Sequence, residues 1–183
     1  MPRNIELKAR IQATAAVHAT AAEISQAPAE VLEQTDTFFP VPQGRLKLRE
    51  IPDQPGELIF YERQDMPGPC ASSYRIYRSD APRELRDILA GSLGVRGIVR
   101  KTRHLYRTEG LRIHIDDVEG LGTYFEIEIL LGPGEEAAEA QERADALAAR
   151  FDIASDDLVD VAYIDLLEEA AGGGLPESGS VSS

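Results

Sequence analysis

The chain has 183 residues, with 32 acidic and 19 basic side chains and a formal net charge of −13. Binding to nucleic acid in general needs a basic surface that neutralises phosphates, so this charge disfavours a nucleic-acid partner. The single cysteine, Cys70, excludes an internal disulfide. We expect a cytoplasmic protein with no membrane partner, because the sequence shows neither a secretory leader pattern nor a run of about 18 apolar residues.

The negative charge is concentrated near the C-terminus. From Gly132 onward the sequence has 13 acidic and 2 basic residues, so nearly all lysines and arginines lie in the first 131 residues. A small anionic ligand is therefore compatible with this first part, whereas a long polyanion is disfavoured.

Alternation of apolar and polar residues predicts a mainly β, α+β chain. Residues 3–11 place Ile5, Leu7 and Ala9 on one face and charged residues on the other. Strands are expected at 3–11, 35–39, 45–51, 57–63, 73–78, 95–107, 111–117 and 123–131, and helices at 13–27, 82–93, 134–151 and after an N-cap at Ser155–Asp157. Consecutive strands are close enough to pair antiparallel. We expect one domain over residues 1–170 and a disordered tail over 171–183.

The second face of the strands carries charge of both signs. A single strand of this kind usually turns its charged face to water. Many like charges on one sheet face repel each other, however, unless an anion or carboxylates compensate. A closed barrel of about eight strands has room for a small ligand between inward-facing residues, which predicts a polyanion pocket. Ten of the basic residues lie on such faces: Lys8, Arg10, Arg45, Lys47, Arg49, Arg63, Arg75, Lys101, Arg103 and Arg112.

Carboxylates lie on the same kind of strand face. Glu126 and Glu128 are two residues apart, and Glu6 and Asp116 occupy corresponding positions in their own strands. Hard oxygen ligands of this kind suit Mg²⁺ or Mn²⁺, which proteins often hold with one or two carboxylates and substrate phosphates. Basic groups for phosphates together with acidic groups for a metal are the parts that phosphoryl-transfer chemistry needs.

At these residues the chain resembles the CYTH family, also called the triphosphate tunnel metalloenzymes, and within it the class IV adenylyl cyclase branch. Asn4-Ile-Glu6-Leu-Lys8 is similar to the E-x-E-x-K signature of the family. The resemblance spans roughly residues 3–167 and implies an eight-stranded antiparallel closed barrel, or tunnel, with flanking helices that binds a triphosphate and a divalent metal. It continues through the segments 35–39, 44–50, 100–103, 116–128 and 163–167.

The resemblance also implies roles for individual residues. In the strand expected at 111–117, Asp117 is an alternative to Asp116 as a metal ligand, although the alternation from Ile113 and Ile115 favours Asp116 as the inward residue. The expected metal ligands are Glu6, Asp116, Glu126 and Glu128. The phosphate-binding residues that the resemblance implies are Lys8, Lys47, Arg49, Arg63, Lys101 and Arg103, and the charged strand faces add Arg10 and Arg112. The candidate catalytic residues are Lys8, Lys47, Arg49 and Arg103.

Asn4 departs from the signature, which has a first Glu at this position. An amide keeps one acceptor oxygen but loses the charge, so we expect a second metal to be affected more than the first. Lys8 is interpreted as a phosphate clamp; removal of a proton by Lys8, or by His114, is the alternative.

Two reactions suit such a pocket. In a cyclase, the ribose 3′-hydroxyl of ATP attacks the α-phosphorus; in a triphosphatase, water attacks the terminal phosphorus. We rank a cyclase-like or nucleoside triphosphatase activity above an inorganic tripolyphosphatase. A non-catalytic nucleotide- or polyphosphate-binding module is the competing hypothesis because of Asn4. A lipocalin-like carrier would need an apolar interior, which the alternating charges contradict. No feature of the sequence predicts an oligomeric state.

Overall fold

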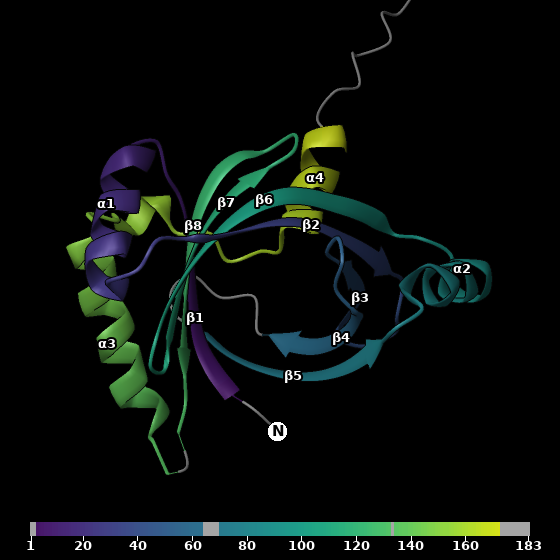
Figure 1. Ribbon diagram of the computed structural model, residues 1–183, viewed down its shortest axis with the longest axis horizontal. Helices are drawn as coiled ribbons and strands as arrows, with labels where there is room; N and C mark the ends of the chain where they lie inside the picture. The colour runs from purple at the N-terminus through teal and green to yellow at the C-terminus, as the bar shows by residue number, and fades with distance from the viewer. Residues whose placement is uncertain (1–2, 64–69, 133, 173–183) are drawn as a thin grey trace, which may run out of the picture.

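A curled antiparallel β-sheet with flanking helices forms the molecule (Figure 1). The computed structural model describes residues 3–63, 70–132 and 134–172. The strands are β1 (Arg3–Arg10), β2 (Glu30–Phe39), β3 (Arg45–Glu50), β4 (Gly56–Arg63), β5 (Cys70–Ser79), β6 (Gly97–Thr108), β7 (Leu111–Val118) and β8 (Gly122–Leu130). The α-helices are α1 (Thr14–Ser25), α2 (Pro82–Leu93), α3 (Ala137–Arg150) and α4 (Tyr163–Gly172), and Ser155–Asp157 form a short 3-10 turn.

The strand pairings run in a ring, in the order β1-β5-β4-β3-β2-β6-β7-β8, and every neighbouring pair is antiparallel. The ring closes at the pairing of β1 with β5, which we call the seam. The seam is short: β1 pairs with β8 from Asn4 to Arg10 but with β5 only from Arg3 to Glu6. Past the seam, Ala9 forms a bridge with Leu158. The predicted mainly β, eight-stranded antiparallel sheet with flanking helices is confirmed, and its closure depends on this seam.

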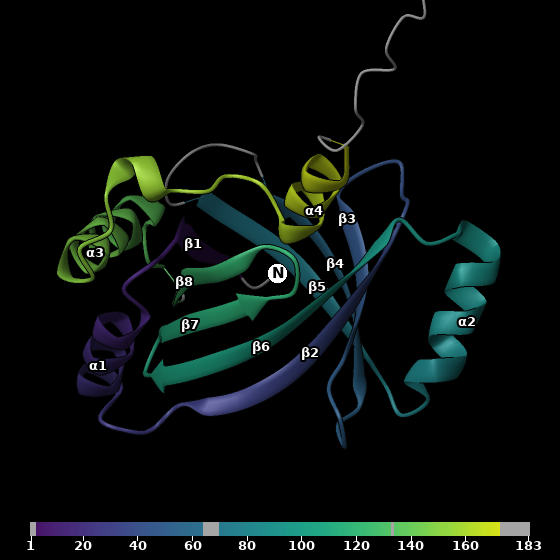
Figure 2. The same ribbon diagram turned by 90° about the horizontal axis from the view of Figure 1, so that it is seen from above.

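The outer face of β1, β7 and β8 is apolar and forms the larger core. Ile127 and its neighbours on this face pack against α1 and α3, which lie together on one flank of the sheet (Figures 1 and 2). Helix α3 buries Ala140, Ala144 and Ala148. These small side chains are spaced by one helical turn, so the helix approaches the sheet closely along one stripe.

Helix α4 packs on the sheet away from this core. Its first residues, Tyr163 and Ile164, are buried with Phe38, Val99 and Tyr124 in a second apolar cluster. Gly97 allows this approach, because a Cβ at that position would lie 2.5 Å from Ile164 Cδ1. Helix α2 lies on the opposite flank from α1 and α3 (Figure 2).

Several element boundaries differ from the expected ones. Strand β2 begins at Glu30, five residues before the predicted start. The prediction missed these residues because the inward residue Gln34 is polar and interrupts the alternation of apolar and polar side chains. Strand β5 begins at Cys70, and α4 begins at Tyr163 after a separate turn.

Helix α4 also extends two residues into the segment that we expected to be a disordered tail. The rest of that tail, residues 173–183, lies outside the described residues, as do residues 64–69 between β4 and β5. Within residues 3–63, 70–132 and 134–172, none of the helices has the length and hydropathy needed to cross a membrane.

Candidate functional site

The inner face of the curled sheet surrounds a cavity of about 700 Å³. This volume lies within the range of about 300–1,000 Å³ that is typical of small-molecule sites. All eight strands contribute alternate residues to it, and so do Ala162 and Tyr163 at the start of α4. The charged lining residues are Glu6, Lys8, Glu30, Asp36, Arg45, Lys47, Arg49, Glu57, Arg78, Lys101, Arg103, Arg107, Arg112, Glu126 and Glu128.

Asp36 on β2 fixes two of the predicted phosphate-binding cations. Its carboxylate accepts hydrogen bonds of 2.8 Å from Lys47 Nζ and from both Nε and Nη2 of Arg49. Asp36 is only 3% exposed. Burial alone would raise its pKa, but the charges of Arg49 and Lys47 outweigh that effect and hold the pKa well below its usual range. Asp36 therefore stays ionised and holds both cations at the cavity wall.

Asp116 on β7 does the same for the next pair of cations. Its carboxylate accepts hydrogen bonds from Lys101 Nζ at 2.8 Å, from Arg103 at 2.7 and 2.6 Å, and from the Tyr163 hydroxyl at 3.1 Å. Burial opposes ionisation of Asp116, but Arg103 and Lys101 lower its pKa by more. Asp117 is exposed, so the inward residue of the two is Asp116, as the alternation predicted.

These bonds give Asp116 a position behind the cations, and it is not among the residues that line the cavity. Its oxygens already accept four hydrogen bonds, which supports a role as a counter-ion for Lys101 and Arg103. The expected role of Asp116 as a metal ligand stays a prediction, and the geometry favours Glu126 and Glu128 over it.

The four cations carry more positive charge than their three buried counter-ions, Asp36, Asp116 and Glu126, neutralise. Burial, followed by repulsion from Arg103, lowers the pKa of Lys101 to about 8 in spite of the attraction of Asp116. Burial and the charge of Arg49 likewise lower the pKa of Lys47. This excess of positive charge favours a multiply charged anion in the cavity, where the desolvated wall strengthens the attraction.

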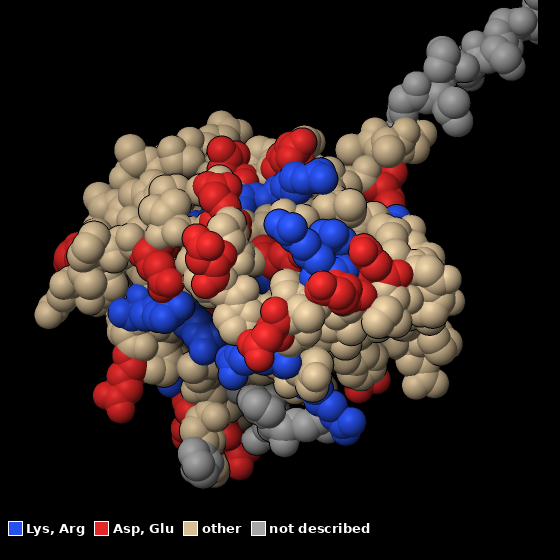
Figure 3. Space-filling model, turned by 45° about the vertical axis from the view of Figure 1, so that its right-hand side comes forward, with Lys and Arg blue, Asp and Glu red and all other residues tan. Residues whose placement is uncertain are grey.

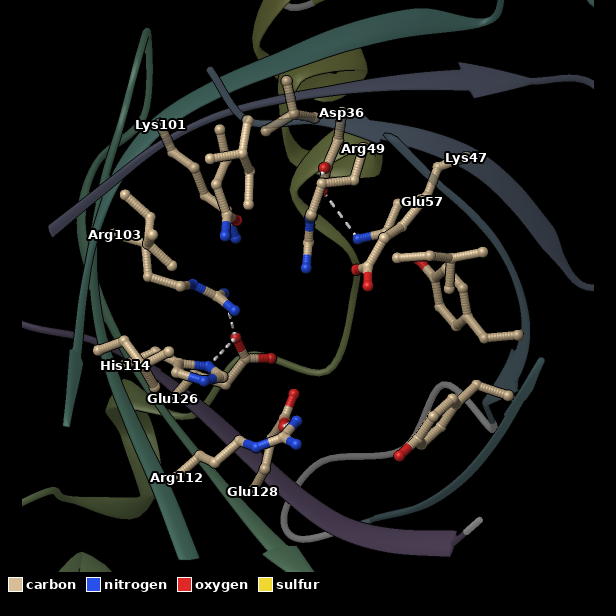
Figure 4. Close-up of a pocket in the computed structure, with 18 of the residues that line it drawn as sticks. Asp36, Lys47, Arg49, Glu57, Lys101, Arg103, Arg112, His114, Glu126 and Glu128 are labelled. Atoms are coloured by element: carbon tan, nitrogen blue, oxygen red, sulfur yellow. Dashed lines mark hydrogen bonds and ion pairs between the residues drawn. The ribbon is translucent and has the colours of Figure 1, made fainter. Parts of the chain in front are cut away.

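Carboxylates enter the cavity from β1 and β8, across from these cations. Figure 4 shows Glu126 and Glu128 directed toward the same space as Arg49 and Arg103. Glu6 and Glu128 are direct partners across β1 and β8, and both line the cavity. Like charges directly opposite each other are destabilising; Arg112, 3.3 Å from Glu128, compensates part of this repulsion, and a bound cation would lower it further.

His114 and Asn4 add donors beside these carboxylates. Ligand atoms of His114, Glu126 and Glu128 all lie within 4.8 Å of one another. Asn4 is 4% exposed, and among the described residues its Oδ1 has no hydrogen-bond partner. Carboxylate and amide oxygens are donors that fit Mg²⁺ or Mn²⁺, so the residues present suit the divalent metal that the resemblance implies.

Glu126 also belongs to the network of the cations. Its Oε2 lies 2.8 Å from Arg103 Nη2 and 3.3 Å from His114 Nδ1. Burial would raise the pKa of Glu126, but the hydrogen bond with His114 and the charges of Arg103 and Lys8 hold it well below its usual range. Glu126 therefore carries a negative charge where the cationic and acidic parts of the wall meet.

Lys8 is held by the chain that leads into α4. Its Nζ donates a 3.0 Å hydrogen bond to the Val161 carbonyl and lies 4.4 Å from the centre of the Tyr163 ring. Lys8 is 5% exposed and lines the cavity. The phosphate-binding role expected for Lys8 stays a prediction.

The remaining predicted residues lie in different environments. Arg112 lines the cavity and pairs with Glu128 at 3.3 Å. Arg10 is exposed, is not among the lining residues, and donates a 2.8 Å hydrogen bond to the Tyr124 hydroxyl. The side chain of Arg63 lies outside the described residues. On the face shown in Figure 3, basic and acidic side chains lie close together over much of the surface.

Two residues that hold the cations of the candidate site had no predicted role. Asp36 lies in a strand segment that alternation identified, but only the β2–β3 register shows that it faces Arg49. Tyr163 comes from a helix, and no strand pattern reveals that its hydroxyl reaches Asp116.

A curled antiparallel sheet with flanking helices encloses a cavity lined by cations and carboxylates. The CYTH domain model matches residues 2–163, and the chain belongs to this family. A protein of Methanocaldococcus jannaschii named "Putative adenylate cyclase" is 31% identical over 68 residues, which are 37% of this chain and 39% of the relative. The match thus spans about two-fifths of the length of that curated relative.

Solved structures show the same fold. The PH1012 protein from Pyrococcus horikoshii has a TM-score of 0.78 and 21% identity over 89% of this chain and 98% of its own. A "putative adenylate cyclase" from Vibrio parahaemolyticus has a TM-score of 0.69 and 22% identity over 90% of this chain and 97% of its own. A "putative adenylyl cyclase" from Hippeastrum, described as revealing a dominant triphosphatase activity, has a TM-score of 0.64 and 16% identity, with coverage of 97% and 98%.

Proposed function

We propose that the protein is a divalent-metal-dependent enzyme that acts on a triphosphate. The observation that carries this proposal is the pairing of Lys47, Arg49, Lys101 and Arg103 with buried counter-ions on a wall that faces the carboxylates of β1 and β8. The names of the Methanocaldococcus relative and the Hippeastrum structure support a cyclase-like or triphosphatase activity.

The cations bind the phosphate chain and stabilise charge on its oxygens. Preorganised donors act strongly here because Asp36 and Asp116 hold them in place before the substrate arrives. Lys8 adds a further positive charge beside Glu126, its partner across β1 and β8. These groups orient the chain for attack and require no covalent intermediate.

Glu6, Glu126 and Glu128 would hold Mg²⁺ or Mn²⁺, with the Asn4 amide oxygen as a further donor. When bound, the metal neutralises phosphate charge and orients the phosphate chain. The neutral amide at position 4 supports one strongly held metal ion over two, because one carboxylate of the family signature is missing.

Two reactions are consistent with this site. In the cyclase, the 3′-oxygen forms a bond to the α-phosphorus, the bond from that phosphorus to the bridging oxygen breaks, and pyrophosphate leaves. In the hydrolase, a water oxygen bonds to the terminal phosphorus, the bond from that phosphorus to the bridging oxygen breaks, and the diphosphate leaves with that oxygen. In each case a proton is lost from the attacking hydroxyl or water. Lys8 and His114, which both line the cavity, are the candidate acceptors of this proton.

Turnover of a substrate panel tests the proposal. Purified protein is incubated with Mg²⁺ or Mn²⁺ and ATP, GTP, thiamine triphosphate or tripolyphosphate, and phosphate, pyrophosphate and cyclic AMP are measured. We expect product from at least one substrate, and a loss of about 100-fold or more in Glu126→Gln. Glu119→Gln, at an exposed position outside the cavity, is the control. Equal turnover by Glu126→Gln and the wild type would show that the reaction does not use this site.

A second candidate is a non-catalytic module that binds nucleotides or polyphosphate. It is favoured by Asn4, which lowers the negative charge available to a metal while leaving the phosphate-binding cations in place. Binding of a triphosphate that depends on Arg103, without product from any member of the panel, would support this candidate over the enzyme.

A further inference from the structure

One part of the cavity wall is apolar. Strands β4 and β5 direct Ile59, Tyr61, Tyr74 and Ile76 into the cavity, and these four residues are called the aromatic wall below. Ile59 faces Ile76 in the β4–β5 register, and Tyr61 faces Tyr74. Because the two pairs are two residues apart on each strand, they form one continuous patch. Glu57 and Arg78, on the same two strands, lie beyond Ile59 and Ile76 and also line the cavity, whereas β1, β3, β7 and β8 place only polar or charged side chains there.

The aromatic wall lies directly beside the cations. Lys47 is the partner of Ile59 across β3 and β4, and its Nζ lies 5.6 Å from the centre of the Tyr61 ring. The same Nζ lies 2.8 Å from Asp36. A ligand whose phosphates contact Lys47 therefore reaches the aromatic wall with the part of the molecule next to those phosphates.

Such a wall does not suit a bare phosphate chain. A phosphate placed against Ile59 and Ile76 would lose water and gain no hydrogen bond in return. Tyrosine rings instead stack with aromatic rings and contact them over a large area. Burial raises the pKa of Tyr61, so its hydroxyl stays neutral and can donate a hydrogen bond to an uncharged group of the ligand.

Gln34 gives a second, independent indication. It is 5% exposed and lines the cavity, and its Oε1 is one of three buried side-chain atoms in the described part of the chain that lack a hydrogen-bond partner. A buried acceptor without a donor is costly. A fully ionised polyphosphate has no N–H or O–H group to offer, whereas a nucleoside has several.

We propose that the aromatic wall binds the ring of an organic triphosphate and makes the site select ring-bearing triphosphates over inorganic tripolyphosphate. The inference rests on the proposed triphosphate site. Tyr61 and Tyr74 thereby determine specificity, while the cations contribute equally to both kinds of ligand.

Equilibrium binding separates these contributions. The affinities of ATP, methyl triphosphate and tripolyphosphate are measured by calorimetry for the wild type and for Tyr74→Ala, with Tyr77→Ala as the matched control. Tyr77 lies on the same strand but is 65% exposed and outside the cavity. We expect Tyr74→Ala to weaken ATP binding about 10- to 100-fold and to change the two ring-free ligands less than twofold. Tyr77→Ala should change none of them.

A second variant, Ile59→Thr, shortens the side chain opposite Lys47 and introduces a hydroxyl into the aromatic wall. It should weaken ATP binding in the same selective way, which keeps the test valid if Tyr74→Ala fails to fold. Equal weakening of all three ligands, or of none, by both variants would overturn the inference while leaving the triphosphate site intact. Failure of the wild type to bind any of the three would instead refute the proposed function, and the inference with it. Thiamine triphosphate in place of ATP then identifies the kind of ring.

Discussion

Replacement of Asp36 by asparagine tests the buried ion cluster most directly. The substitution preserves shape but removes a negative charge that is 3% exposed and accepts three hydrogen bonds from Lys47 and Arg49. It also places an amide that can donate next to two donors. Removing one partner of a buried ion pair lowers the free energy of unfolding by about 3–5 kcal/mol. Asparagine keeps one oxygen that can accept a hydrogen bond, so we expect a loss near the lower value.

This cost corresponds to a clear change in thermal stability. For a chain of this size, 1 kcal/mol shifts Tm by about 2–4 °C, so about 3 kcal/mol lowers Tm by about 6–12 °C. The measurement is thermal unfolding of ligand-free Asp36→Asn followed by circular dichroism. Asp87→Asn is the control, because Asp87 is 77% exposed and lies 3.7 Å from its partner Arg86. Such surface pairs contribute about 0–1 kcal/mol. A Tm for Asp36→Asn that matches the wild type within about 2 °C would refute a buried, mutually dependent ion cluster.

Three other predictions concern binding. The pKa of Lys101 is about 8 in the folded protein, below its ordinary value, so Lys101 loses its positive charge as the pH rises through 8. Triphosphate affinity, measured by calorimetry at pH 7 and pH 9, should therefore fall between these two values. The fall should be smaller in Lys101→Arg, because arginine keeps its charge over this range. An unchanged affinity across this range would contradict that charge state. Asn4→Glu restores a carboxylate beside Glu6 and should tighten Mn²⁺ binding about tenfold or add a second equivalent, measured by electron paramagnetic resonance of free Mn²⁺ without substrate. The same affinity and stoichiometry in both proteins would show that position 4 does not face the metal. Arg10→Ala should leave triphosphate affinity within about twofold of the wild type, because Arg10 bonds to Tyr124 outside the cavity lining; a loss of tenfold or more would return Arg10 to the site.

Much of the fold and of the candidate site could be predicted from the alternation of apolar and polar residues along the strands. Because successive side chains of a strand point to opposite faces, Lys47, Arg49, Lys101 and Arg103 could be placed on inward faces without knowing which strands pair. The same parity favoured Asp116 over Asp117, and the structure agrees. Local patterns of this kind survive folding because the core fixes which face is buried.

Alternation could not give the position of a residue along the barrel axis or its partner across strands. Arg10 shares a strand face with Lys8 but falls beyond the cavity lining. Asp116 shares an inward face with Glu126, but the β6–β7 register places Arg103 directly beside it, and the cations occupy its oxygens. Tyr163 enters from a helix that is distant in sequence. These placements depend on register and on tertiary packing, which period and charge do not encode.

The contacts of Lys8 and Tyr163 have a consequence for how the protein matures. Lys8 is anchored to Val161, and the Val159 N–H donates to the Lys8 carbonyl, so the first strand is completed by residues about 150 positions later. Synthesis proceeds from the N-terminus, and contacts between distant residues form late because they close long loops. The cavity therefore takes its final form only after the segment that precedes α4 has left the ribosome. A nascent chain that stops before this segment would contain all eight strands and still lack part of the wall of the cavity.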